Sequence, residues 1–173
     1  MKPPRASRVA LLSAALGAVV SLAVYAADLS PVSDFGAPEP GFGGATQVAR
    51  VTQAGAGNQL NATQAGHNGL MANQIGVANA AITSQAGNDN WTVLQQNGNV
   101  NQYAGYQAGQ YNRSTAVQNG SGNDATVMQI GNSMSAQVTQ YGNNNEISIL
   151  QSRSGSGLSV TQTGGARAAV LMK

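Results

Sequence analysis

Apolar and polar residues alternate along short segments of this chain, most clearly at residues 145–151, which read NEISILQ. In that segment Asn145, Ile147, Ile149 and Gln151 would point one way and the residues between them the other way. Alternation with a period of two is the pattern of a β-strand with one buried face. Small aliphatic residues hold the two central inward positions elsewhere, as at Leu60 and Ala62, Ala125 and Val127, Ala136 and Val138, and Leu158 and Val160. We therefore expect a series of strands whose inner face is small and aliphatic.

Glutamine marks these segments at a fixed interval. The spacing is eleven residues at every step except the step of ten between Gln64 and Gln74. The series consists of Gln53, Gln64, Gln74, Gln85, Gln96, Gln107, Gln118, Gln129, Gln140, Gln151 and Gln162. A period kept over this length indicates a repeat architecture.

Glycine and asparagine keep the same phase. Glycine stands two positions after the glutamine, and Arg153 is the one replacement; asparagine stands six positions before the next glutamine, with Met134 and Ser156 as replacements. The glycines are Gly55, Gly66, Gly76, Gly87, Gly98, Gly109, Gly120, Gly131, Gly142 and Gly164. The asparagines are Asn58, Asn68, Asn79, Asn90, Asn101, Asn112, Asn123 and Asn145. The unit is Q-x-G-x-x-N-x-h-x-h-x, where h is apolar.

Each unit predicts a strand of about seven residues followed by a tight turn of about four. A strand this short cannot bury its narrow face alone, so the units should stack. We predict an all-β solenoid over residues 47–173. A helix would not tolerate glycine at such regular positions. Disorder would fit the polar composition, but a disordered segment has no need of a strict register.

Glutamine and asparagine suit the inside of a stacked solenoid, where equivalent residues lie about 4.8 Å apart. The NH2 group of one amide can meet the C=O group of the next, which avoids about 1–3 kcal/mol for each unpaired buried group. A finite ladder leaves unpaired amides and strand edges at its ends. Residues 44–53 enter the pattern without a helix or charged cap, so we expect the N-terminal end to be open to another chain.

Residues 1–26 have the pattern of a secretory signal peptide. Basic residues near the start precede an apolar run over Val9–Val24, and the small residue at Ala26 offers a cleavage site. An uncleaved membrane anchor is the alternative, although the run is shorter than the about 20 residues that span a bilayer. Residues 27–46 would then be a flexible secretion or linker segment ahead of the solenoid.

Removal of residues 1–26 would change the charge of the chain. Five basic and six acidic residues remain, so the net charge is 5 − 6 = −1. Nucleic-acid binding requires clustered cations, and no such cluster is left. We therefore expect no nucleic-acid partner.

Residues suited to catalysis or metal binding are scarce. The sequence has no cysteine and a single histidine, His67, in the shortened turn. Asp89, Asp124 and Glu146 are scattered among the repeats. Neither a metal cluster, a histidine-dependent nucleophile nor a paired-carboxylate site is expected, and we predict no enzyme activity, cofactor or small-molecule substrate. We expect the aromatic side chains of the repeats to pack along the walls: Trp91, Tyr103, Tyr106, Tyr111 and Tyr141.

The repeat resembles the curlin repeat of bacterial curli fibre subunits, over Gln47 to about Lys173. The resemblance implies a rung of about 22 residues made from two units, about six rungs in this chain, and a cross-β amyloid in the fibre. It also implies export, passage through the outer-membrane curli pore with accessory factors, and assembly with itself and the other curli subunit into cell-surface fibres (fimbriae) that mediate adhesion and form biofilm matrix.

The C-terminal units are irregular and carry a basic end made of Arg153, Arg167 and Lys173. A step of eleven from Gln162 puts Arg167 at an asparagine position and Lys173 at a glutamine position. This resembles the closing stretch of minor curlins, which implies the nucleator subunit; the major fibre subunit is the alternative. On physical grounds the cations could instead only block growth at that end, because stacked like charges repel.

A second class of function is a capped, non-polymerising solenoid that acts as a surface adhesin or an ice binder. Ice binding requires a flat array of one outward residue type. The outward positions are mixed instead, as at Arg50, Asn61, Met71, Ile82, Val93 and Ala104. The sequence therefore favours the self-assembling subunit.

Overall fold

The computed structural model of the chain describes residues 20–26 and 47–173. The predicted secretion or linker segment at residues 27–46, and residues 1–19 of the predicted signal peptide, lie outside the described residues. The described part is all-β, which confirms the predicted fold class. No helix in it is long and apolar enough to cross a membrane.

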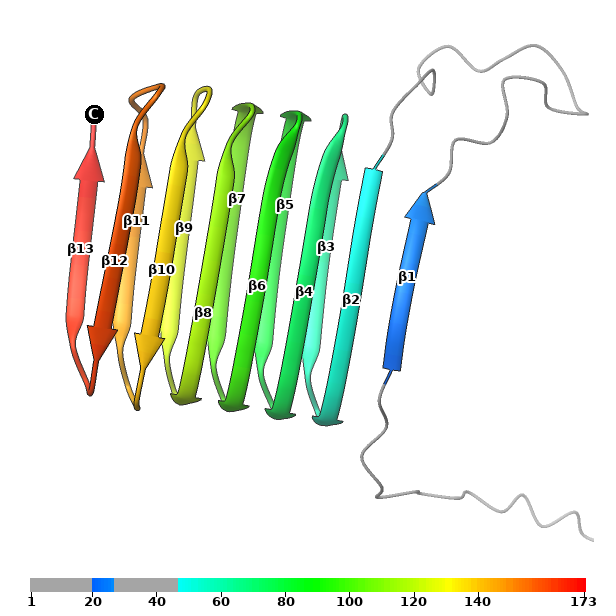
Figure 1. The fold of residues 1–173 in the computed structure, drawn as a ribbon, viewed down its shortest axis with the longest axis vertical. Coiled ribbons are helices and arrows are strands. Elements are labelled where there is room, and N and C mark those ends of the chain that lie inside the picture. Colours follow the sequence, from blue (N-terminus) through cyan, green and yellow to red (C-terminus); the bar gives the residue numbers. More distant parts are fainter. Residues whose placement is uncertain (1–19, 27–46) are drawn as a thin grey trace, which may run out of the picture.

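The strands form two sheets that lie face to face, with β2 and β13 at opposite ends of the stack (Figure 1). The first sheet contains, in spatial order, β1 (Val20–Ala26), β2 (Gln47–Ala56), β4 (Asn68–Val77), β6 (Asn90–Asn99), β8 (Arg113–Ser121), β10 (Ser135–Tyr141) and β12 (Gly157–Thr163). The second sheet contains β3 (Gln59–Ala65), β5 (Ala80–Asn88), β7 (Gln102–Gln110), β9 (Asp124–Ile130), β11 (Glu146–Gln151) and β13 (Arg167–Met172).

Successive strands from β2 to β13 alternate between the sheets, so each pair from β2–β3 to β12–β13 forms one of six rungs. Strands of neighbouring rungs pair in parallel, and Gln74 lies beside Gln96, 22 residues later. The shortened turn at His67 reduces the first offset, so that Gln53 lies beside Gln74, 21 residues later. The solenoid and its number of rungs agree with the prediction.

The core is a narrow column between the sheets, built from the inward residues of β2 to β13. Ile147, Ile149, Ala116 and Val138 are each at most 1% exposed. The outward residues Arg50, Met71 and Ile82 are exposed, as the alternation predicts. The period-two pattern therefore fixes which side of each strand is buried.

The inner face is less uniform than predicted. Tyr103 is buried in the core, not packed along the outer wall, and its hydroxyl group hydrogen-bonds Ser114 Oγ at 2.8 Å. Gly105 makes room for the ring, since a Cβ atom there would lie 2.6 Å from the Tyr103 hydroxyl oxygen. Thr83 is also buried. In β7 the large side chain of Tyr103 is thus compensated by the absence of a side chain at Gly105, so the core stays close-packed. The repeat consensus does not show this, because both residues depart from the small aliphatic residues found at these positions in other strands.

The turns bend through glycine at the position predicted from the sequence, except the turn after β11, where Arg153 stands. Gly98 has φ of 121°, and a Cβ atom on it would lie 1.9 Å from the carbonyl oxygen of Gly120 in the next rung. A second position, two residues later, also has positive φ, and at Val100 it is 56°. A β-branched residue in this region is strained by about 1–3 kcal/mol. The sequence pattern did not reveal this second position because residues of many types occupy it.

β1 lies within the predicted signal peptide and pairs antiparallel with β2, with Val20 opposite Gln53. In the full-length chain this pairing covers the outer edge of β2. The expectation of an open N-terminal end concerns the chain without residues 1–26, in which β1 is absent, and it stays a prediction for that chain. The other strand of the first rung, β3, has β5 as its single strand neighbour among the described residues.

Candidate functional site

The glutamines form two continuous columns, one at the same inward position of each sheet. In each column the side-chain Nε2 of one glutamine donates to Oε1 of the glutamine in the next rung. The N–O distances between equivalent glutamines are 2.5–2.9 Å from Gln53 to Gln162 in the first sheet and 2.7–2.8 Å from Gln64 to Gln151 in the second. Every bond runs toward the C-terminal end, so the ladder has a direction.

The same amides also tie the two sheets together. Gln96 Nε2 donates to the carbonyl oxygen of Ala80 in the second sheet at 3.1 Å, and Gln107 Nε2 donates to that of Trp91 in the first sheet at 3.3 Å. The buried glutamines therefore use both N–H groups, one along the stack and one across it. This cross-sheet bond explains why a long amide occupies a position next to the core.

The asparagines form two further columns at the turns, and they bond mainly to backbone. Asn101 Oδ1 accepts the backbone N–H of Asn123 at 3.1 Å, and Asn101 Nδ2 donates to the carbonyl oxygen of Gly120 at 2.9 Å. Asn101 Nδ2 also reaches Asn79 Oδ1 at 3.1 Å. The asparagines from Asn58 to Asn123 all donate in this way to the turn glycine of the next rung, which links the asparagine and glycine spacings of the repeat physically.

The asparagine columns break in the C-terminal rungs. Met134 and Ser156 occupy asparagine positions, as the sequence predicts; Met134 still donates its backbone N–H to Asn112 Oδ1 at 3.1 Å. Arg153 lies exposed in the irregular turn after β11. There Gly155 carries the positive φ, at 75°.

The predicted positions of Arg167 and Lys173 are wrong by one residue. The last turn is shortened, so Gln151 lies beside Met172, and Ala166 donates its N–H to Asn145 Oδ1 at 3.1 Å. Ala166 and Met172 therefore hold the ladder positions. Arg167 points outward and forms an ion pair with Glu146, with 3.2 Å between Nε and Oε2. A deletion in a turn shifts the following strand without any change in its own alternation, so the sequence pattern alone did not reveal it.

A charged column runs up the outer face of the second sheet through Asp124, Glu146 and Arg167 in successive rungs. Burial raises the pKa of Asp124, and the nearby Glu146 carboxylate raises it further. Arg167 offsets part of the repulsion because it pairs with Glu146. Burial also raises the pKa of Tyr103 to about 12, despite its bond to Ser114, so this phenol stays neutral inside the core.

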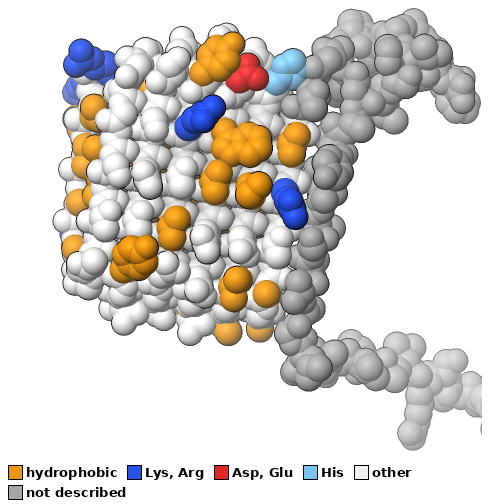
Figure 2. Space-filling model, in the orientation of Figure 1, with side chains coloured by type: hydrophobic (Ala, Val, Ile, Leu, Met, Phe, Trp, Pro, Cys, Tyr) orange, Lys and Arg blue, Asp and Glu red, His pale blue; other side chains and the backbone are white. Residues whose placement is uncertain are grey.

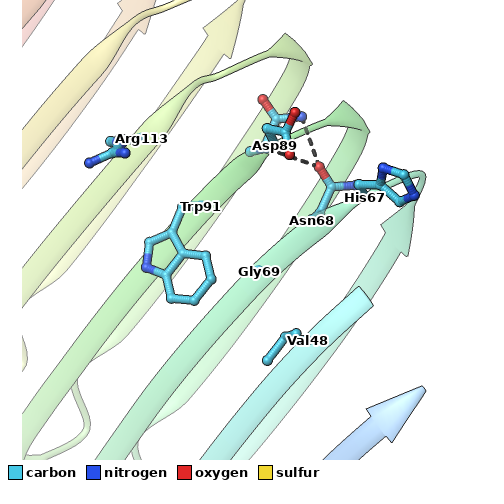
Figure 3. Close-up of a pocket in the computed structure, with 8 residues that line it drawn as sticks. Val48, His67, Asn68, Gly69, Asp89, Trp91 and Arg113 are labelled. Carbon is cyan, nitrogen blue, oxygen red and sulfur yellow. Dashed lines mark hydrogen bonds between the residues drawn. The ribbon is translucent and has the colours of Figure 1, made fainter. Parts of the chain in front are cut away.

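A hollow of about 350 Å³ lies on the outer face of the first sheet, lined by Val48, His67, Asp89, Trp91 and Arg113 among others. The Trp91 ring lies over β4 toward Gly69, and Arg113 extends from the next strand (Figure 3). Within the described residues, no group of three or more histidine, cysteine, aspartate or glutamate side chains is arranged to hold a metal ion.

The two end faces of the stack expose strand edges of the same kind. At one end β3 has a single neighbour, and at the other end β12 and β13 each have one. Leu60 and Val170, which are inward residues of the end rungs, are only partly buried. The end faces therefore present backbone groups, amides and apolar side chains in the arrangement that adjacent rungs use to bind each other.

No protein-family model, curated protein or solved structure matches this chain.

Proposed function

We propose that this chain is a self-assembling structural subunit of an extracellular amyloid fibre of the curli type. The observation that carries the proposal is the directional glutamine ladder, which runs through the rungs from Gln53 to Gln162. Within the described residues β3, β12 and β13 lack an outer neighbour, and β2 has only β1, which would be removed with residues 1–26. A structure in which each rung templates the next can continue into a second subunit without a change of geometry.

The proposed junction joins the C-terminal rung of one subunit to the N-terminal rung of the next. β12 would receive β2, and Gln162 Nε2 would donate to Gln53 Oε1, in the direction of all other glutamine bonds. β13 would receive β3, where Met172 meets Gln64 in place of an amide pair. One column therefore continues through the junction and the other does not.

The mismatch at Met172 and Ala166 favours the nucleator role over the major subunit. The last rung, β12–β13, has one incomplete glutamine column and no asparagine. We expect its exposed face to bind another subunit less tightly than the exposed face of the first rung, β2–β3. Such a subunit adds from one end and presents the other as a template. The exposed Arg167, which pairs with Glu146 and not with a ladder amide, does not itself block stacking.

The major fibre subunit is the second candidate. The glutamine column of the first sheet, which is unbroken from Gln53 to Gln162, favours it because this column alone supports growth from both ends. A non-polymerising adhesin would need covered ends; among the described residues, the pairing of β1 with β2 is the feature in its favour.

Export to the cell surface completes the proposal. The signal-peptide pattern of residues 1–26 supports passage across the inner membrane, after which the outer-membrane curli pore and its accessory factors would be the partners.

Incubation of the purified chain without residues 1–26 tests the proposal. We expect a lag, then thioflavin-positive fibres with reflections near ~4.7 Å and ~10 Å. A chain that stays monomeric at high concentration would contradict it. Seeding of a separate major curlin by these fibres, compared with self-seeding, then separates nucleator from major subunit.

A further inference from the structure

Trp91 forms a flat aromatic surface on the outer face of the first sheet. Its ring lies over β4, where Gly69 has no side chain, and one face of the ring is turned outward (Figure 3). A Cβ atom on Gly69 would lie 1.9 Å from the ring carbon Cε3, so the ring rests on the backbone of the neighbouring strand. Val48 of β2 lies in the same column beyond Gly69 and extends the apolar surface. Trp91 is nevertheless 38% exposed.

Polar groups surround this ring. Asp89 lies in the turn between β5 and β6, and Arg113 of β8 lies beside Trp91; all three line the hollow of about 350 Å³. Figure 2 shows hydrophobic side chains gathered with acidic, basic and histidine side chains on this part of the face. Among the described residues, no hydrogen bond or ion pair engages the Asp89 carboxylate, the Trp91 indole N–H or the Arg113 guanidinium. The hollow therefore offers an acceptor and two donors around an apolar surface.

This combination matches the chemistry of a pyranose sugar ring. The C–H groups of a pyranose form two flat faces, and its hydroxyl groups project from the edge. An aromatic face is electron-rich and attracts such polarised C–H groups. A carboxylate can accept hydrogen bonds from the hydroxyl groups, while a guanidinium and an indole N–H can donate to them. The volume lies at the lower end of the about 300–1,000 Å³ of ligand sites, which suits one or two sugar rings.

Other classes of ligand fit this hollow less well. A small apolar molecule requires a site that encloses most of its surface, whereas Trp91 lies on an open sheet face. Single-stranded nucleic acid also stacks on aromatic side chains, but every base brings a phosphate group. Asp89 would repel that phosphate, and Arg113 is the one arginine or lysine among the described residues that line the hollow.

We propose that this hollow binds a sugar unit of a polysaccharide, with the flat face of a β-linked pyranose stacked on the Trp91 ring. Asp89 accepts hydrogen bonds from hydroxyl groups at one edge of the sugar, and Arg113 donates to hydroxyl groups at another. Sugars with equatorial hydroxyl groups, such as glucose, fit best because no axial oxygen separates their C–H face from the indole.

Repetition of the hollow along a fibre would strengthen the binding. A single stacked ring makes few contacts, so one site binds weakly. Six rungs at about 4.8 Å place equivalent hollows about 29 Å apart in a fibre of the proposed type. A polysaccharide that runs along the fibre can then occupy several hollows at once, which raises the overall affinity without any new kind of contact. The repeated binding rests on the proposed function, whereas the hollow itself belongs to the single chain.

Fluorescence of Trp91 tests the site directly, because it is the one tryptophan of the sequence. A β-1,4-linked glucose trimer is titrated into the full-length chain, and we expect a saturable shift in the emission. Asp89→Asn and Arg113→Gln should each raise the Kd by at least about fivefold, since each removes part of the hydrogen bonding. Asparagine tolerates the φ of 56° at position 89, so the turn is retained. Arg153→Gln, in the turn after β11, is the matched control and should leave the Kd unchanged.

Three results would overturn the sugar site. The first is the absence of a saturable shift with the glucose trimer. The second is an equal shift with glucitol, which carries the hydroxyl groups of glucose without a ring, or equal Kd values of all four chains. The third is a shift produced by a single-stranded DNA oligonucleotide at lower concentration than by the trimer, which would assign the hollow to nucleic acid instead.

Retention on an insoluble β-linked glucan tests the repeated binding. Filaments of the chain without residues 1–26 should bind at least about tenfold more tightly than the soluble full-length chain, and Arg113→Gln filaments should lose most of this binding. Equal retention of filaments and soluble chain would overturn the repeated binding. If no filaments form, the proposed function is wrong, while the fluorescence titration still decides whether the hollow binds sugar.

Discussion

At the scale of single residues, stability depends on side chains that bond to their equivalents in the next rung. Gln96 accepts from Gln74, donates to Gln118 and also binds the Ala80 carbonyl oxygen. Its sequence neighbour Gln95 lies exposed on the outer face. Glutamine should therefore contribute strongly to stability at position 96 and little at position 95.

Replacement of Gln96 by leucine should destabilise the fold, because it leaves the Gln118 Oε1 atom and the Ala80 carbonyl oxygen without their donors. We expect a loss of about 2–4 kcal/mol in the free energy of unfolding, measured by urea denaturation. Gln95→Leu is the matched control and should change it by less than about 0.5 kcal/mol. Equal effects of the two changes would contradict the ladder.

The stacked glycines give a second prediction. Gly98→Ala would place a Cβ atom 1.9 Å from the Gly120 carbonyl oxygen, at a φ of 121°. We expect a loss of more than about 2 kcal/mol in the same assay. Gly157→Ala is the control, because no atom lies within 4 Å of a Cβ atom there. A tolerated Gly98→Ala would mean that the turns do not stack as closely as described.

At the scale of strands, each outward column brings side chains of successive rungs into contact, and the sign of their charge then matters. Asp124 lies between Gln102 and Glu146 in the second sheet. Parallel stacking thus forces two carboxylates together, and Arg167 compensates for one of them. The strand pairing, not the sequence spacing, creates this cluster.

The raised pKa of Asp124 predicts a pH dependence. Its value is above the ordinary 3.8 because burial and Glu146 disfavour the charged form. The folded state therefore holds this proton more tightly than the unfolded state, and the resulting stabilisation is present below pH 3.8 and lost as the pH rises through the raised pKa. Asp124→Asn should be more stable than the unsubstituted chain at neutral pH by about 0.5 kcal/mol.

Urea midpoints of both chains between about pH 3 and about pH 7 check this prediction. The two curves should converge at the acidic end, where Asp124 is protonated. If the two curves run parallel over the whole range, protonation of Asp124 does not change the stability of the folded chain, and the prediction is wrong.

At the scale of the whole molecule, the two ends of the stack differ. The β2 edge is covered by β1 in the full-length chain, whereas β12 and β13 have no outer strand neighbour within the described residues. The last rung also lacks the glutamine and asparagine of its second strand, since Met172 and Ala166 occupy those positions. Assembly should therefore be directional and sensitive to the N-terminal segment.

Removal of residues 1–26 should accelerate assembly, because it exposes the β2 edge and the Gln53 amide. We expect the full-length chain to elongate seeds at least about tenfold more slowly, which corresponds to about 1.4 kcal/mol. Thioflavin kinetics on identical seeds measure this difference. A full-length chain in which β1 is interrupted by Leu22→Pro is the control and should regain the faster rate. Equal rates of all three chains would show that β1 does not obstruct the edge.

The sequence by itself determined the solenoid and the inward side of the repeat strands, because the periods of two and eleven are local and leave few ways to stack. The rung of two units was expected from the resemblance to the curlin repeat, and the strand pairing agrees with it. The sequence also determined the glutamine and asparagine ladder positions up to Gln162. The tertiary structure alone decided how the last strand is aligned, since the shortened turn before Arg167 moves Met172 to the ladder position. It alone placed Tyr103 in the core beside Gly105 and brought Asp124, Glu146 and Arg167 together. Such features depend on which rung lies next to which, and residues 21 or 22 positions apart become neighbours only after the chain has stacked.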